Sequence, residues 1–337
     1  MTSNSSIPGT MRAVFLEKQG GPLVVREVKT PVPGPGEVLI KIAAAPVNPS
    51  DLAGIRNAHD NFDLGSFIPG LEGSGRVVAV GKGLLPWLWK GKRVACSAKY
   101  HTSGTWAEYM VTPAAMCFPL NKKISDEQGS MLLVNPLTAL AFFEIVKQGK
   151  HKAIINNAAA SALGRMVELL GNKVHVPVIN IVRNKSQSDL LISTGSPYVL
   201  DSSSPEFLQN LRDLSLKLNA TLLFDSVCGS QLGNIIESLP YGSSVVIYGN
   251  LSLAEEIKIN PRSLIDNGIT ITGFYLGSRS KENGMIKNLL NLMEVSRLMR
   301  SDMKIKISNR FPLIKAQEAV DTYLGNMTAG KVLLVPG

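Results

Sequence analysis

Residues 153–185 read AIINNAAASALGRMVELLGNKVHVPVINIVRNK, and their pattern predicts a strand, a turn, a helix and a second strand in succession. Residues 153–155 are apolar, and the small residues that follow turn the chain into a helix running toward Gly171. Gly171 and the asparagine after it predict the end of that helix. Residues 176–182 are apolar and β-branched except for Pro177 and Asn180, which predicts a second, parallel strand. We therefore interpret the whole stretch as a βαβ unit.

The turn between the first strand and the helix is a candidate phosphate-binding loop. Backbone N–H groups and the positive end of a helix converge there, which suits a pyrophosphate. The three glycine positions of the G-x-G-x-x-G fingerprint are occupied by Ala159, Ser161 and Gly164, so only the third glycine is kept. We expect Gly164 to permit tight packing of the helix. On its own, this partial match does not identify a nucleotide site.

The end of the second strand indicates which nucleotide the unit would bind. An acidic residue at this position binds the ribose 2′-hydroxyl of NAD, whereas a basic residue accommodates a 2′-phosphate. This chain has Arg183 and Lys185 there and no carboxylate. A guanidinium grips a phosphate through two parallel hydrogen bonds, so the pair favours NADPH. The alternative is a solvated basic loop without a ligand.

The composition is that of an ordinary globular protein, with 337 residues, 45% hydrophobic and 18% charged. No apolar run is long enough to cross a bilayer and residues 1–10 lack a signal core, so we expect a cytoplasmic protein without a membrane partner. The net charge of +9 comes from dispersed lysines and arginines, so we expect no nucleic-acid partner. Three separated cysteines predict neither a disulfide framework nor a zinc site.

The chain divides into two domains by its pattern of strands and helices. Short strands with Gly and Pro punctuation predict a β-rich, barrel-like domain over residues 11–122. Six strands alternating with helices predict a doubly wound parallel sheet over 123–300. Residues 301–337 return to the style of the first domain and are expected to complete it.

Several motifs, taken in order, resemble the medium-chain dehydrogenase/reductase superfamily. They are residues 47–51 (VNPSD), 69–75 (PGLEGSG), 104–109 (GTWAEY), 135–139 (NPLTA) and 329–331 (AGK). The resemblance covers nearly the whole chain and implies an α/β fold, with a GroES-like partial barrel and a Rossmann domain. Zinc-dependent members carry Gly-His-Glu where this chain has Gly-Leu-Glu at 70–72, and no cysteine lies near 48–51. This departure implies the metal-free branch of quinone reductases and enoyl thioester reductases.

The resemblance also implies the residues of the site. Those expected to bind the cofactor are Asn135, Thr138, Ala160, Ser161, Ala162, Leu163, Arg183, Lys185, Tyr248, Gly249, Phe274, Leu276 and Lys331. Enoyl thioester reductases place a tyrosine proton donor in the loop after the Asn-Pro-Ser-Asp motif, and ungapped counting puts His59 there. Histidine titrates near neutrality and could donate the proton, or it is simply a solvated loop residue.

We therefore expect NADPH to deliver hydride to a quinone or an α,β-unsaturated carbonyl compound. Without a metal, donors such as the Asn48 side chain, backbone amides and Lys331 would stabilise the developing oxyanion. A trans-2-enoyl thioester reductase and a non-catalytic NADPH-binding protein are the alternatives. Relatives are commonly homodimers joined by edge strands of the nucleotide-binding sheet, so we expect a homodimer. The strand over residues 269–274 could be that edge or lie inside the sheet.

Overall fold

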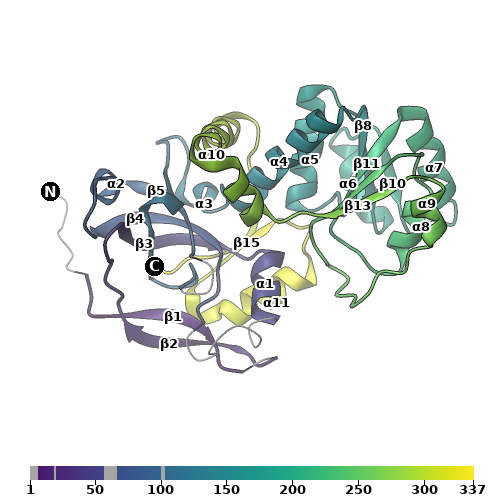
Figure 1. Cartoon of the computed structure of the whole chain (residues 1–337). Coiled ribbons are helices and arrows are strands. Elements are labelled where there is room, and N and C mark those ends of the chain that lie inside the picture. The colour runs from purple at the N-terminus through teal and green to yellow at the C-terminus, as the bar shows by residue number, and fades with distance from the viewer. Residues whose placement is uncertain (1–6, 19, 57–66, 100–102) are drawn as a thin grey trace. The chain divides into compact units, whose positions relative to one another are not determined.

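A computed structural model describes residues 7–18, 20–56, 67–99 and 103–337 and divides the chain into two units (Figure 1). The first unit comprises the chain up to Val134 and from Leu292, and the second comprises Asn135–Asn291. The second unit is therefore shorter at both ends than the predicted segment 123–300. One reason is that helix α3 (Asp126–Gly129) packs against strands of the first unit.

The first unit contains a seven-stranded sheet and a two-stranded hairpin. The sheet has the strand order β14-β15-β3-β4-β5-β7, with β6 paired to β3, and the hairpin pairs β1 with β2. The elements of the unit besides α3 are β1 (Thr10–Leu16), β2 (Leu23–Lys29), β3 (Glu37–Pro46), α1 (Pro49–Arg56), β4 (Glu72–Val80), α2 (Leu84–Trp89), β5 (Arg93–Ser97), β6 (Tyr109–Pro113), the 3-10 helix η3 (Ala114–Met116), β7 (Cys117–Pro119), β14 (Ile307–Phe311), η4 (Leu313–Lys315), α11 (Ala316–Gly325) and β15 (Lys331–Leu334).

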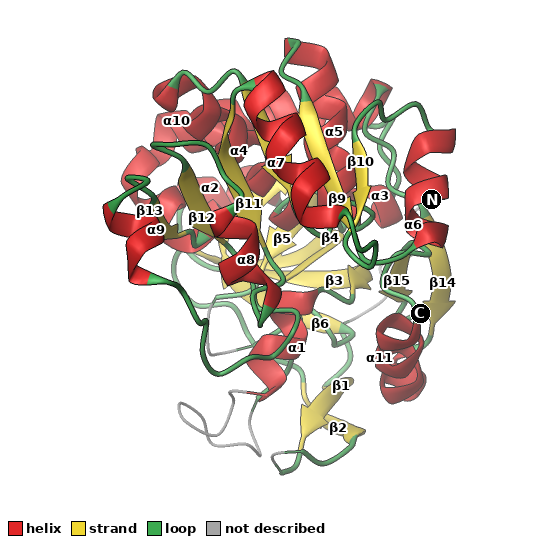
Figure 2. Cartoon of the chain, turned by 90° about the vertical axis from the view of Figure 1, so that its right-hand side faces the viewer, coloured by secondary structure: helices red, strands yellow, loops and turns green. Residues whose placement is uncertain are grey.

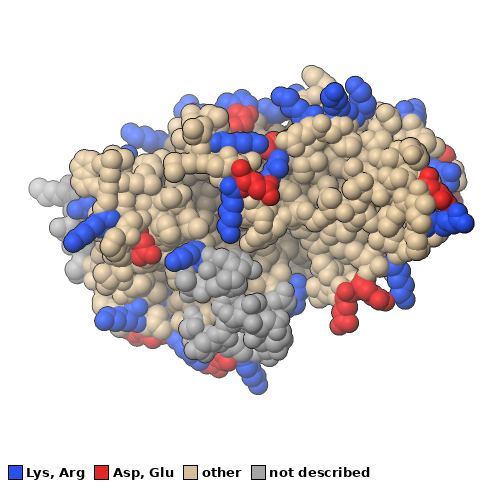
Figure 3. Space-filling model, in the orientation of Figure 1, with Lys and Arg blue, Asp and Glu red and all other residues tan. Residues whose placement is uncertain are grey.

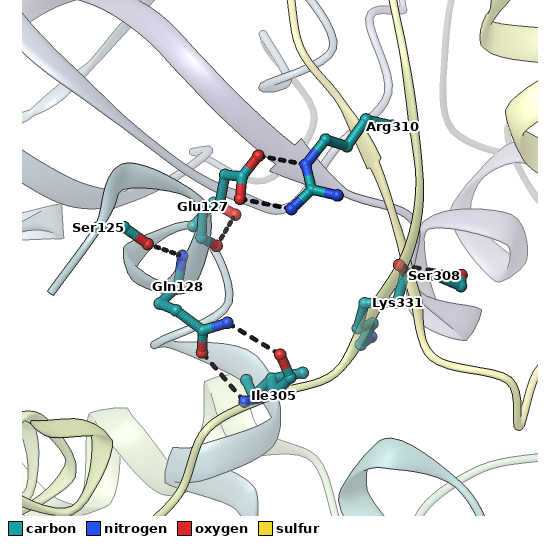
Figure 4. Close-up of polar contacts among 8 residues, drawn as sticks. Ser125, Glu127, Gln128, Ile305, Ser308, Arg310 and Lys331 are labelled. Atoms are coloured by element: carbon teal, nitrogen blue, oxygen red, sulfur yellow. Dashed lines mark hydrogen bonds and ion pairs between the residues drawn. The ribbon is translucent and has the colours of Figure 1, made fainter. Parts of the chain in front are cut away.

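The C-terminal segment pairs and packs with the elements of this unit. Its strand β15 pairs antiparallel with β3, and its helix α11 contributes buried side chains to the core that Val14, Ile40 and Trp106 share. Polar contacts fasten the returning chain to α3 (Figure 4). The Arg310 guanidinium donates twice to the Glu127 carboxylate, and Gln128 exchanges two hydrogen bonds with the backbone of Ile305.

The second unit is a six-stranded parallel sheet with the strand order β10-β9-β8-β11-β12-β13, which is that of a dinucleotide-binding Rossmann fold. Its elements are α4 (Val134–Gly149), β8 (Ala153–Asn156), α5 (Ala162–Val174), β9 (Val178–Val182), α6 (Lys185–Ser193), β10 (Val199–Asp201), α7 (Phe207–Leu218), β11 (Ala220–Asp225), α8 (Gln231–Glu237), β12 (Ser244–Ile247), α9 (Pro261–Ile265), β13 (Thr270–Gly273) and α10 (Leu276–Ser301). Helices α4 and α10 extend past the boundaries of the unit. Among the described strands, β13 lies at the edge of the sheet, which settles the alternative left open above.

Both faces of this sheet are buried, because neighbouring residues of a strand point to opposite faces (Figure 2). Ile155 packs with α7 and α8 on one face, whereas Ile154 packs with α4 and α5 on the other. In β11, Leu223 joins the first cluster while Leu222 and Phe224 join the second. This two-sided burial explains why the strands read as continuous apolar runs.

The predicted end of helix α5 is wrong. The helix continues through Gly171 to Val174 and ends with His175 in the left-handed region at φ 57°. A Cβ at Gly171 would lie 2.4 Å from Cγ2 of Val178 and 2.9 Å from the carbonyl oxygen of Val176. Gly171 is therefore needed for close packing of the helix against the following strand, and it is not a stop signal.

Candidate functional site

Most of the cofactor-binding residues expected in the second unit lie at the carboxyl ends of its parallel strands. The residues at 160–163, 183, 185, 248–249 and 274 follow the carboxyl ends of strands β8, β9, β12 and β13. Strand β8 lies between β9 and β11, so the strand order reverses beside it. Open parallel sheets bind ligands at such a switch point, outside the carboxyl ends of the strands.

The turn after β8 is tight and packs closely against the start of α5. Ala158 adopts φ 55°, and the Ser161 hydroxyl caps α5 by accepting a hydrogen bond from the Gly164 amide at 3.0 Å. A Cβ at Gly164 would lie 2.4 Å from the carbonyl oxygen of Ala159. The remaining glycine of the fingerprint is thus needed where the helix meets the turn. The N-terminus of α5 leaves amides available for an anion.

Asn157 and Asp225 form a further part of this region that sequence reasoning missed. The Asn157 amide donates to the Asp225 carboxylate, which also accepts from the amides of Val227 and Cys228 at 3.0 and 2.7 Å. Burial raises the pKa of Asp225, and these hydrogen bonds oppose the rise. The pair joins the ends of β8 and β11 across the switch point. The available signal in the sequence was a polar residue directly after one apolar strand, Asn157, and another at the end of a second, Asp225.

Arg183 and Lys185 differ in whether their charged groups form ion pairs with other described residues. Arg183 is exposed, and its guanidinium has no ion pair within the described residues. Lys185 begins α6 and already pairs with Asp189, with Nζ–O distances of 2.8 and 3.0 Å. Asn184 caps the same helix by accepting from the Gln187 amide. Arg183 is therefore the more available of the two cations.

An aromatic cluster lies at the ends of β12 and β13. Phe142 of α4 stacks on Phe224 with ring centroids 4.0 Å apart, and it meets Tyr248 and Phe274 edge-on at 4.9 and 5.2 Å. Burial raises the pKa of Tyr248 to about 12, so its phenol stays protonated at neutral pH. Asn135 and Thr138 are the second and fifth residues of the same helix α4, and Leu276 begins α10.

Two of the remaining site residues, Asn48 and Lys331, belong to a buried polar cluster in the first unit. Lys331 donates to the Asn48 side-chain oxygen, and the Asn48 amide nitrogen donates to Glu72 at 3.0 Å. Asp51 accepts from the backbone amides of Asn48 and Leu71, each at 2.8 Å. Asn48, Asp51, Glu72 and Lys331 are each at most 2% exposed. Residues almost 300 positions apart in the chain therefore form one network.

Charge in this cluster is strongly perturbed by burial. Burial raises the pKa of Asp51 to about 7, and the neighbouring Glu72 carboxylate adds to the rise. Burial also raises the pKa of Glu72 and lowers the pKa of Lys331, although the attraction between the Lys331 ammonium and each carboxylate opposes both shifts. The second oxygen of Glu72 accepts from the backbone amides of Leu133 and Val134 at 3.0 and 2.9 Å. Glu72 therefore holds the beginning of α4.

The proposed proton donor His59 lies outside the described residues. Within the parts of the chain that are described, no group of three or more His, Cys, Asp and Glu side chains is placed to hold a metal ion. The Glu72 carboxylate, next to Leu71, is occupied by the hydrogen bonds given above. No described helix is both long and apolar enough to cross a membrane.

One family model matches part of the first unit and another matches most of the second. Residues 34–122 match the alcohol dehydrogenase GroES-like domain, and residues 149–293 match the zinc-binding dehydrogenase domain. A crystal structure from Mesorhizobium loti, provisionally named an NADPH:quinone reductase, is 30% identical with a TM-score of 0.90. That match covers 98% of this chain and 100% of the other.

Curated relatives align over nearly the whole chain. The mitochondrial enoyl-[acyl-carrier-protein] reductase of Arabidopsis thaliana is 29% identical, over 94% of this chain and 85% of the relative. The synaptic vesicle membrane protein VAT-1 homolog of Mus musculus is 25% identical, over 97% of this chain and 84% of the relative. The first name states an enoyl reductase activity and the second states no reaction, although both sequences align over nearly the whole chain.

Proposed function

Because this chain belongs to the medium-chain dehydrogenase/reductase superfamily, we propose that it is an NADPH-dependent oxidoreductase acting on a quinone or an α,β-unsaturated carbonyl compound. The observation that carries the proposal is the exposed Arg183 guanidinium, unpaired within the described residues, after the second strand of the Rossmann sheet. A carboxylate there would repel a 2′-phosphate, whereas a guanidinium binds it. The relative named an NADPH:quinone reductase supports the same cofactor and acceptor class.

The residues of the second unit would hold the cofactor in an extended pose along the strand ends. The turn at Ser161 would face the pyrophosphate and Arg183 the 2′-phosphate. Tyr248 and Phe274 would border the nicotinamide and exclude water from it. NADPH, when bound, supplies the hydride.

The first unit would supply polar donors to the reaction. The Asn48 amide nitrogen carries two hydrogens, and one of them donates to Glu72. We propose that the second hydrogen, or an amide of the backbone, stabilises the oxyanion that develops as hydride arrives. Lys331 holds the Asn48 side chain by donating to its oxygen. A quinone needs little more assistance, because it is already a strong hydride acceptor.

Two alternative functions have support of their own. Enoyl thioester reduction is supported by the relative from Arabidopsis thaliana and requires a proton donor, for which His59 is the candidate. A non-catalytic NADPH-binding role is supported by the histidine at the tyrosine position and by a relative whose name states no reaction. The three functions differ in which acceptor is turned over.

The experiment follows NADPH oxidation with an ortho-quinone, a simple enone and a trans-2-enoyl thioester, comparing the parent protein with His59→Ala. His175→Asn serves as a matched control, because His175 is exposed and asparagine tolerates its left-handed backbone. Quinone or enone turnover that is indifferent to His59 would support the proposal. Thioester turnover that collapses in His59→Ala would favour the enoyl reductase, and bound NADPH without turnover of any acceptor would favour the binding protein.

We also propose a homodimer formed through the edge of the second unit's sheet. Strand β13 has one neighbour among the described strands, so its other side leaves backbone groups unpaired. The following helix α10 carries exposed apolar side chains, including Met285, Ile286 and Leu290 at 85%, 78% and 58% exposure. An exposed apolar helix face and an open strand edge in the same unit would suit contact with a second copy across a two-fold axis.

A further inference from the structure

Helix α2 of the first unit presents an exposed apolar surface that the proposed reaction does not use. Residues 84–89 read LLPWLW, and Leu84 and Trp87 are 75% and 66% exposed. Leu85 and Leu88 are also exposed, at 38% and 42%. Four large apolar side chains on one short helix are more than the single exposed residues that soluble proteins ordinarily tolerate. We call Leu84, Leu85, Trp87 and Leu88 the α2 patch.

Helix α2, which carries the patch, is held by packing and by a hydrogen bond to the rest of the first unit. Pro86 is buried beneath the helix, and the Trp89 indole N–H donates to the Ala114 carbonyl oxygen at 3.0 Å. Trp89 also packs against the core of the first unit. Gly83 precedes the helix with φ 133°, which an L side chain rarely adopts. The apolar side chains are therefore held outward by the fold, and a partner can bind them without rearranging the helix.

Positive charge surrounds the α2 patch. Lys82 precedes the helix and Lys90 and Lys92 follow it, and all three are exposed. None of the three forms an ion pair with another described residue, although Lys92 lies 5.4 Å from the centre of the Trp89 ring. Figure 3 shows largely uncharged surface over α2 with Lys and Arg side chains near it. The apolar centre and the cationic border thus occupy one small area.

We propose that the α2 patch docks this protein on an anionic lipid surface. Tryptophan and leucine enter the boundary between headgroups and acyl chains, while flanking lysines keep their charges among the lipid phosphates. A protein interface is less well matched, because a standard interface takes about 20–30 residues from each partner and the patch offers four side chains. The expectation of no membrane partner was based on the lack of an apolar run long enough to cross a bilayer. Binding to the surface of a membrane does not require such a run.

The test is co-sedimentation of the full chain with phosphatidylcholine vesicles, with and without phosphatidylserine. We expect binding to the vesicles that contain phosphatidylserine, weaker binding at high salt, and a blue shift of tryptophan fluorescence. Trp106 is fully buried and Trp89 is partly buried, so the shift reports on Trp87. Each charge reversal, Lys82→Glu or Lys90→Glu, changes the charge by two units and should weaken binding roughly thirtyfold.

The apolar contribution is tested by the double variant Leu84→Asp with Trp87→Asp. Both side chains are exposed, so the variant should keep the thermal midpoint and NADPH binding of the parent while losing vesicle binding. The matched control is Leu216→Asp, which changes a leucine that is 58% exposed on α7. No vesicle binding by the parent, or equal binding by parent and double variant, would overturn the proposal. A self-association lost in the double variant, without vesicle binding, would instead assign the patch to a second copy.

Discussion

Replacement of Arg183 by alanine tests the cofactor assignment most directly. In the structure the Arg183 guanidinium is exposed, and within the described residues it has no carboxylate partner that must first be released. A hydrogen bond to a charged group contributes about 1.5–3 kcal/mol, and solvent at this exposed site places the loss near the lower figure. We therefore expect Arg183→Ala to weaken NADPH binding by roughly tenfold. NADH has no 2′-phosphate, so its affinity should stay nearly constant.

Lys185 provides an internal comparison for this prediction. Its ammonium pairs with Asp189, and both side chains are well exposed, at 83% and 58%. Such a pair contributes only about 0.3–0.5 kcal/mol. Asp189→Asn should release Lys185 toward the phosphate and strengthen NADPH binding by up to roughly twofold, without changing NADH binding.

Isothermal titration of NADPH and NADH into the parent, Arg183→Ala and Asp189→Asn proteins measures all of these affinities. The informative quantity is the ratio of the dissociation constants of NADPH and NADH, because a general loss of folding would weaken the binding of both cofactors together. An unchanged ratio in Arg183→Ala would refute the reasoning. An unchanged ratio would instead support the alternative interpretation, in which the basic residues after β9 form a solvated loop without a ligand.

The remaining predictions concern the buried cluster and the assembly. The raised pKa of Asp51, about 7, means that the folded protein keeps a proton that the unfolded chain has already lost, so the free energy of unfolding should fall between about pH 4 and about pH 7. Asp51→Asn should remove that part of the slope in urea unfolding, and parallel profiles for parent and variant would contradict it. Light scattering should show a dimer that Ile286→Asp, at a side chain 78% exposed on α10, converts to a monomer, whereas an unchanged mass would exclude this face.

The architecture of the second unit was predictable because its determinants are local. Apolar runs such as 153–155 and 176–182 are short, regularly spaced and separated by turn residues, so strand and helix positions follow from periodicity. The structure places strands at Ala153–Asn156 and Val178–Val182, close to those predictions. The end of α5 was not predictable in this way. The role of Gly171 depends on contacts with Val176 and Val178 across a turn. From sequence alone, a glycine late in a helical segment is interpreted as the end of the helix.

The buried polar cluster of the first unit was not predictable from local sequence. The departure from Gly-His-Glu drew attention to Leu71, but the structure shows the role of its neighbour Glu72, which accepts from Asn48 and from the amides at the start of α4. These contacts join segments far apart in sequence, so no spacing reveals them. Val134, whose amide Glu72 holds, directly precedes Asn135, the first residue of the second unit. Substitutions at Glu72 should therefore be read for effects on the start of α4 as well as on the cluster around Asn48.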